Sequence, residues 1–142
     1  MGIPSYFSHI IRNYSNIIRN LNGLTPQYTL HHLYMDCNSV IYDAVHSINK
    51  QPEQKLNNDE FEEAILDNVV SSITYYITFI KPTKSIYIAF DGVAPFAKMD
   101  QQRTRRYKTQ FMNTVFGSSS TWNTSAITPG TKFMNKLNNR LN

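Results

Sequence analysis

The chain has 142 residues, a hydrophobic content of 41% and a formal net charge of +4 at pH 7, which bounds it to about one domain with a single core. Its one cysteine, Cys37, excludes an internal disulfide and favours an intracellular location. No apolar run reaches the roughly 18 residues that a membrane span needs, so we expect no membrane partner.

The charges are unevenly distributed along the chain. Six of the ten acidic residues lie between positions 53 and 67, and seven of the fourteen basic residues lie between positions 81 and 108. Clustered cations raise the local potential more than scattered ones, so the second block suggests a polyanionic partner. A simple solvated cationic face is the alternative.

The first third of the chain predicts a helix, a strand and a second helix. Residues 4–19 open with Pro4 and Ser5 and carry an apolar stripe typical of a helix. Residues 29–35 predict a strand that finishes at Asp36, and residues 39–48 predict a short helix.

A long helix is predicted next, over residues 59–80, opened by Asn58 or Asp59 and closed by Pro82. It carries a ridge of apolar side chains at four-residue steps, namely Phe61, Ile65, Val69, Ile73 and Ile77. A second, buried strand is predicted at residues 85–90, ending at Asp91.

The last third predicts a basic helix over residues 98–112 and a loop over residues 117–124. Thr128, Pro129 and Gly130 are expected to cap a final helix. The order strand, helix, strand predicts an α/β fold with a parallel βαβ unit. Two strands make a thin sheet, so the architecture looks truncated.

Two aspartates stand at the ends of the predicted strands. Ligands of parallel sheets bind beyond the carboxyl ends of the strands, so Asp36 and Asp91 are expected to face the same crevice. A pair of carboxylates suits a hard cation such as Mg²⁺, which takes oxygen ligands. Either acid could instead simply end a strand or cap a helix, and the spacing does not identify the metal.

Four polar side chains share one face of the basic helix. Lys98, Gln102, Arg105 and Arg106 stand at i, i+4, i+7 and i+8, where helical residues are neighbours. Converging Arg, Lys and Gln donors suit a doubly charged terminal phosphate better than a diester. A generic helix that contacts RNA or DNA is the alternative.

The helix after the first aspartate supplies two further candidates. Asn38 could hydrogen-bond a sugar hydroxyl, and Tyr42 could stack on a base. Ordinary packing explains Tyr42 equally well from spacing alone.

Several motifs in order resemble the N-terminal part of the catalytic domain of Xrn-type 5′→3′ exoribonucleases. They are Met1 to Pro4, Leu33 to Asn38, the long motif Ala89 to Arg106, and Ile127 to Met134. The resemblance extends over residues 1–142. It implies a PIN/FEN-like nuclease core, in which a divalent metal, Mg²⁺ or Mn²⁺, is held partly by Asp36 and Asp91.

The resemblance also implies specific RNA contacts. Lys98, Gln102, Arg105 and Arg106 match the family's pocket for the 5′-monophosphate, and Asn38 matches a family asparagine. Tyr42 stands where the family typically has a base-stacking His. Ser39 replaces a usual Gly and Phe96 a usual Arg, which puts the contacts of that Arg in doubt.

These features together predict a metal-dependent 5′→3′ exoribonuclease that acts on single-stranded RNA bearing a 5′-monophosphate. A two-metal site needs more acids than Asp36 and Asp91, so we expect an N-terminal fragment whose partner is the remainder of the catalytic domain, in cis or in trans. Such a protein belongs in the cytoplasm or nucleus, and a viral origin also fits.

Two other functions compete with the nuclease. One is a non-catalytic module that binds RNA 5′ ends. The other is a phosphatase with a nucleophilic strand-end aspartate, but that enzyme would want a second Asp where this chain has Asn38.

Overall fold

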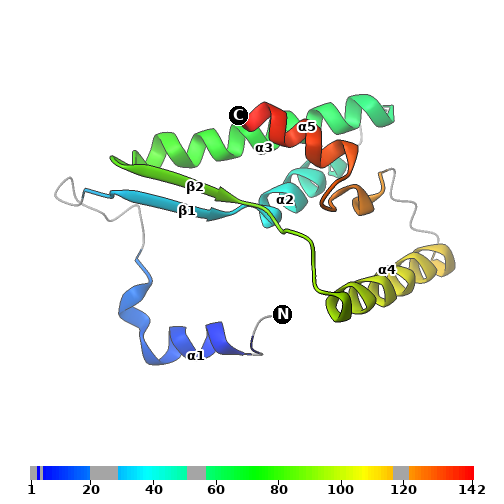
Figure 1. Ribbon diagram of the computed structural model, residues 1–142, viewed down its shortest axis with the longest axis horizontal. Coiled ribbons are helices and arrows are strands. Elements are labelled where there is room, and N and C mark those ends of the chain that lie inside the picture. Colours follow the sequence, from blue (N-terminus) through cyan, green and yellow to red (C-terminus); the bar gives the residue numbers. More distant parts are fainter. Residues whose placement is uncertain (1–2, 4, 20–28, 51–56, 117–121) are drawn as a thin grey trace.

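The computed structural model describes residue 3 and residues 5–19, 29–50, 57–116 and 122–142. Its elements in chain order are α1 (Tyr6–Asn13), η1 (Ser15–Ile17), β1 (His32–Asp36), α2 (Asn38–Asn49), α3 (Asn58–Ile80), β2 (Ser85–Ala89), α4 (Phe96–Phe116), η3 (Thr124–Ala126) and α5 (Lys132–Leu141), where η1 and η3 are single 3₁₀ turns. The protein is thus mixed α/β and mostly helical (Figure 1).

The two strands form a parallel sheet, which confirms the predicted βαβ connection through α2 and α3. The register pairs His32 with Ser85 at one end and Asp36 with Ala89 at the other. Backbone bonding continues past β1, because the Cys37 N–H donates to the Ala89 carbonyl at 2.9 Å. The carboxyl ends of both strands are therefore firmly aligned.

The hydrophobic core lies between α2, α3 and α5. The predicted ridge on α3 is largely confirmed, since Phe61, Ile65, Val69 and Ile73 are buried and Ile77 is half-buried. From the other elements, the buried residues are Cys37, Ile41, Ala44, Val45, Trp122, Ile127, Phe133 and Leu137. The core thus holds one layer of helices against the sheet.

Local hydrogen bonds set the ends of α3. The helix begins one residue earlier than predicted, because the Asn57 side chain accepts from the Glu60 N–H and the Glu60 carboxylate accepts from the Asn57 N–H. This reciprocal capping box satisfies two N–H groups that the helix leaves unpaired. At the other end Lys81 takes a left-handed conformation, with φ 50°, just before Pro82.

The predicted bounds of three other helices were wrong. α1 ends at Asn13 rather than at residue 19, since the backbone of Tyr14 leaves the helical region. α4 is longer than the predicted 98–112, and its first turn starts directly after Pro95. The cap of α5 is Thr131, whose hydroxyl accepts from the Met134 N–H, rather than residues 128–130.

Two predicted features fall partly outside the described residues. Pro4, at the expected start of the first helix, is one of them, and residues 117–121 of the expected loop are another.

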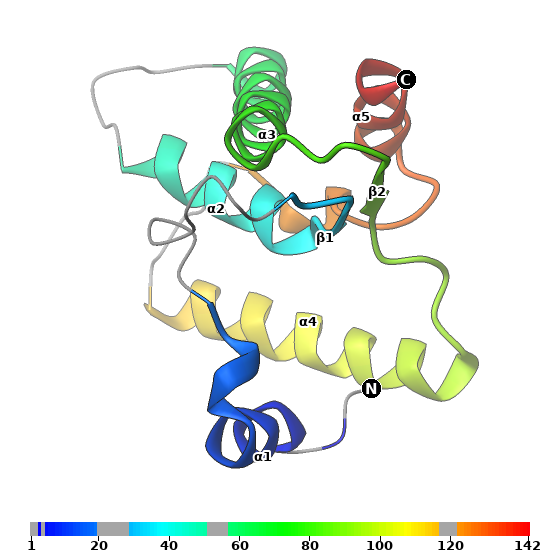
Figure 2. The same ribbon diagram turned by 90° about the vertical axis from the view of Figure 1, so that its left-hand side faces the viewer.

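The strands are less buried than their apolar composition predicted. Tyr34 and Tyr87 face each other on adjacent strands with exposed fractions of 71% and 62%. α3 and α5 cover only one side of the sheet, while α1 and α4 lie beyond its other side, apart from the main body (Figure 2). A second strand buried on both faces needs a second covering layer, which the described residues do not supply.

Candidate nucleic-acid interface

The two strand-end aspartates lie at the same edge of the sheet. Asp36 is the last residue of β1, and Asp91 comes two residues after β2 ends at Ala89, so it is not the strand's last residue as predicted. Both side chains are exposed. Among the described residues, no group of three or more His, Cys, Asp or Glu side chains is placed to hold a metal ion.

Asn38 connects these two strand ends. It is the first residue of α2, it is half-buried, and its Oδ1 accepts a hydrogen bond from the backbone N–H of Asp91 at 3.1 Å. The contact fixes the start of the β2–α4 connection against the start of α2. The sequence analysis considered only a ligand for Asn38, and nothing in the spacing from 38 to 91 indicated this bond.

Tyr42 lies one turn after Asn38 on the same face of α2. Its side chain is 46% exposed, while Ile41, Ala44 and Val45 are the residues of α2 that enter the core. Residues four apart on a helix are neighbours, so Tyr42 and Asn38 present one polar and aromatic surface next to the strand ends.

Cys37 stands between Asp36 and Asn38 but points into the core. Its side chain is fully buried. Burial raises the pKa of the Cys37 thiol, and the neighbouring Asp36 carboxylate raises this pKa further. The thiol therefore stays protonated and acts as a small core residue.

α4 borders the main hollow of the described surface, which has a volume of about 880 Å³. Three of the four predicted phosphate-binding residues line it: Lys98, Gln102 and Arg105. The other described residues that line it also come from α4, and they are Ala97, Asp100, Gln101, Thr104 and Lys108.

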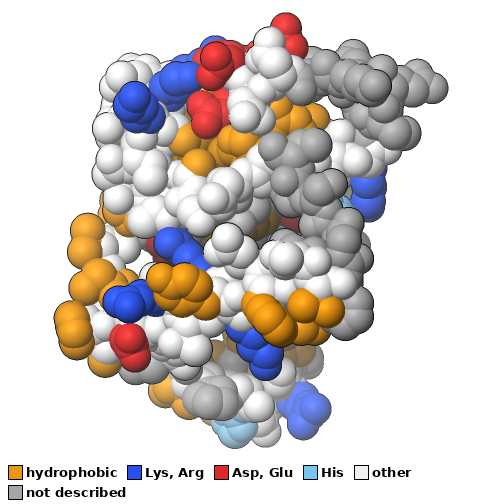
Figure 3. All heavy atoms as spheres, turned by 90° about the vertical axis from the view of Figure 1, so that its right-hand side faces the viewer, with side chains coloured by type: hydrophobic (Ala, Val, Ile, Leu, Met, Phe, Trp, Pro, Cys, Tyr) orange, Lys and Arg blue, Asp and Glu red, His pale blue; other side chains and the backbone are white. Residues whose placement is uncertain are grey.

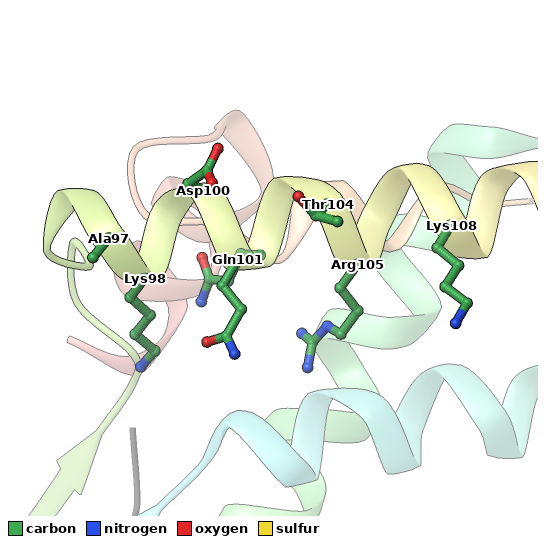
Figure 4. Close-up of a pocket in the computed structure, with 8 residues that line it drawn as sticks. Ala97, Lys98, Asp100, Gln101, Thr104, Arg105 and Lys108 are labelled. Carbon is green, nitrogen blue, oxygen red and sulfur yellow. The ribbon is translucent and has the colours of Figure 1, made fainter.

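The side chains around this hollow are sorted by side of the helix. Lys98, Gln101, Arg105 and Lys108 point toward the same side, whereas Asp100 and Thr104 point the other way (Figure 4). The acid is thus turned away from the cations. Gln101 and Lys108 were not singled out from the sequence, although Lys108 stands three residues after Arg105 and so shares its face.

Arg106 is separated from the other three predicted residues. Its Nη2 donates to the Thr128 hydroxyl at 2.8 Å, and that hydroxyl donates in turn to the Ser125 carbonyl at 2.7 Å. Arg106 therefore joins α4 to the segment that precedes α5. The spacing placed Arg106 on a shared face, but it could not reveal a partner 22 residues away.

The remaining surface of α4 combines cations with apolar side chains. The guanidinium of Arg103 lies 5.9 Å from the centre of the Tyr107 ring, one turn along the helix. Lys and Arg side chains lie beside exposed hydrophobic ones over the lower part of the molecule, where α4 runs (Figure 3). Basic and aromatic groups that alternate in this way are typical of surfaces for single-stranded nucleic acid.

Within the described part of the chain, no helix combines the length and the apolar character that crossing a bilayer requires.

Comparisons with known proteins agree with the resemblance seen in the sequence. The family model described as "XRN 5′-3′ exonuclease N-terminus" matches residues 1–142. The protein named 5′-3′ exoribonuclease 1 of Saccharomyces cerevisiae is 32% identical over 153 residues, which cover 99% of this chain and 10% of that protein. The protein named 5′-3′ exoribonuclease 2 of Candida glabrata is 31% identical over 176 residues, which cover 96% of this chain and 17% of that protein. The chain thus spans a small part of the relatives that it matches.

Proposed function

This chain belongs to the family of XRN 5′-3′ exonuclease N-termini, and we propose that it serves a 5′→3′ exoribonuclease that degrades single-stranded RNA bearing a 5′-monophosphate. In this proposal the sheet is the start of a PIN/FEN-like nuclease core. The chain provides the N-terminal portion of the catalytic domain, and the rest comes in cis or in trans.

The observation that carries this proposal is the one-sided face of α4. Lys98 and Gln102 are half-buried and Arg105 is exposed, and all three border one hollow while Asp100 is turned away. A terminal phosphate carries up to two charges and three free oxygens, which such a set of donors can bind together. A phosphodiester offers less of both, so we propose that this face recognises the 5′ end.

The strand-end acids are proposed to hold a divalent metal, Mg²⁺ or Mn²⁺. The donor chemistry fits, because Asp36 and Asp91 are exposed carboxylates at adjacent strand ends, and hard cations take oxygen ligands. When bound, the metal would activate water and stabilise charge on the reacting phosphate. Asn38 keeps Asp91 in place through its backbone N–H.

Tyr42 is proposed to stack on the leading base. Its ring is about half exposed beside Asn38, close to the strand ends, so it is available to a nucleotide there. Stacking on a tyrosine tolerates any base, as an enzyme that moves stepwise along RNA requires.

Binding of a matched pair of RNAs tests the recognition of the 5′ end. One oligonucleotide carries a 5′-monophosphate and the other a 5′-hydroxyl, and fluorescence anisotropy is measured in EDTA. We expect Arg105→Ala to weaken the phosphorylated RNA about tenfold and the hydroxyl RNA much less. Arg103→Ala removes a cation from another part of the same helix and is the matched control.

Equal losses on both RNAs would mean that Arg105 contacts phosphodiesters only. Loss of affinity in the Arg103 variant as large as that in the Arg105 variant would reduce the effect to general electrostatic attraction.

A non-catalytic module that binds RNA 5′ ends is the second candidate. It is favoured by the fact that the described acids at the strand ends number two, which is few for a two-metal site. A time course with Mg²⁺ or Mn²⁺ separates the two functions. Selective loss of phosphorylated RNA that Asp91→Ala abolishes identifies the nuclease, and binding without turnover identifies the module.

A further inference from the structure

The cationic side of α4 is longer than one terminal phosphate can occupy. Lys98 and Arg105 are seven residues apart, about 10 Å along a helix axis, and Lys108 adds three more residues, or about 4.5 Å. Long, flexible side chains can converge from the first two positions on one phosphate. Lys108 lies beyond them, one turn toward the C-terminal end of the helix.

Lys108 nevertheless belongs to the same hollow. It lines the hollow together with Lys98, Gln102 and Arg105, and its side chain points to the same side as that of Arg105 (Figure 4). Its side chain is exposed. An ammonium group in this position is a compact point charge, suited to a phosphate oxygen that needs no bidentate partner.

We propose that Lys108 binds the first internal phosphodiester of the RNA strand whose 5′-phosphate lies at Lys98, Gln102 and Arg105. This inference rests on the proposed function. It sets the direction of the strand, which runs from the N-terminal part of α4 toward its C-terminal part. It also divides the helix into a segment that binds the 5′ end and a segment that binds the chain behind it.

The contact predicts a dependence on ligand length. A nucleoside 5′-monophosphate has a terminal phosphate but no internal diester, whereas a 5′-phosphorylated dinucleotide has both. Lys108 therefore stabilises the second ligand and not the first. Arg105 stabilises both, because both carry the terminal phosphate.

The test measures binding of these two ligands and of a 5′-phosphorylated tetranucleotide to the whole chain in EDTA. We expect Lys108→Ala to leave the mononucleotide within about twofold and to weaken the other two about five- to tenfold. Lys108→Arg is expected to restore most of the affinity. The salt dependence for the tetranucleotide should lose about 0.7 in the slope of log K against log salt concentration, the value for one contact on a single strand.

Three variants provide the comparison. Arg105→Ala should weaken all three ligands, and Arg103→Ala should weaken none by more than about twofold. Circular dichroism melting shows that each variant is folded, which is expected because Lys108 and Arg103 are exposed.

A Lys108→Ala variant that weakens the mononucleotide as much as the dinucleotide would overturn the inference, because Lys108 would then contact the terminal phosphate. A variant that weakens neither would overturn it as well. If the wild-type chain binds 5′-phosphorylated and 5′-hydroxyl tetranucleotides equally, the proposed recognition of the 5′ end fails. A loss in Lys108→Ala that is the same on those two tetranucleotides would still support the diester contact.

Discussion

At the scale of single residues, the strand ends are organised by one amide. Asn38 accepts from the Asp91 N–H and thereby joins the segment after β2 to the first turn of α2. Because Asp36 ends β1 immediately before Cys37 and Asn38, this bond also holds the two carboxylate-bearing segments next to each other. A residue that the sequence suggested as a ligand thus has a structural role in the site.

Asn38→Ala should lower the free energy of unfolding by about 1–2 kcal/mol, because the variant leaves the Asp91 N–H without its partner. Urea unfolding followed by circular dichroism measures the loss. Asn38→Asp keeps an acceptor oxygen and should recover part of the stability at moderate salt. An alanine variant as stable as the wild type would show that water replaces the bond at no cost.

Arg106 provides a second prediction at this scale. Removing its guanidinium or the Thr128 hydroxyl, by Arg106→Ala or Thr128→Val, should cost a similar amount of stability. The double variant should show a coupling of about 0.5–1 kcal/mol in a double-mutant cycle, since the contact is exposed. Additive losses would mean that the two side chains do not interact in solution.

The same variants examine the phosphate-binding role that the spacing predicted for Arg106. If Thr128→Val strengthens the binding of 5′-phosphorylated RNA and Arg106→Ala weakens it, then the arginine alternates between Thr128 and the phosphate. If neither variant changes the affinity, then Arg106 only attaches α4 to the rest of the molecule.

At the scale of elements, α5 is held against α3 by two kinds of contact. Phe133 is 1% exposed and packs edge-on against Trp122, with ring centres 5.1 Å apart. Outside the core, Arg140 pairs with Glu63 and Asp67, and Lys136 pairs with Glu62 and Glu63. The two sets differ greatly in expected strength, because exposed ion pairs are screened by water and salt.

Phe133→Ala should therefore cost about 3–5 kcal/mol of unfolding free energy, the usual range for a buried phenylalanine. Arg140→Ala should cost less than about 1 kcal/mol, and its effect should shrink further in 1 M salt. Chemical denaturation at two salt concentrations measures both. A larger loss for the arginine than for the phenylalanine would reverse this order and make the ion pairs the main attachment of α5.

The sequence predicted the elements better than their surroundings. Ridge residues such as Ile65 and Val69 recur at helical spacing, so the long helix and its buried side followed from periodicity alone. The ends of helices depend on individual hydrogen bonds, which is why the caps at Asn57 and Thr131 were misplaced. The partners of Asn38 and Arg106 lie far along the chain, and local patterns carry no information about such contacts.

At the scale of the whole molecule, a large apolar surface is exposed. Tyr34 and Tyr87 lie on the uncovered side of the sheet, and α1, α3 and α4 each expose further large apolar side chains. Both strands of the two-stranded sheet also keep an outer edge that no other described strand pairs with. Surfaces of this kind mark sites of association, and exposed strand edges are templates for further pairing.

We therefore expect the isolated chain to self-associate as its concentration rises, through the uncovered side of the sheet. The double variant Tyr34→Thr with Tyr87→Thr should weaken this association while it keeps β-branched residues in the strands. Its cost in unfolding free energy should stay near 1 kcal/mol, because both rings are mostly exposed and only their mutual contact, with centres 6.1 Å apart, is lost. Sedimentation velocity over a range of concentrations measures the association. Tyr75→Thr, which alters an exposed aromatic on α3 instead, is the matched control, and association that this control reduces as strongly would place the contact on the helix rather than on the sheet.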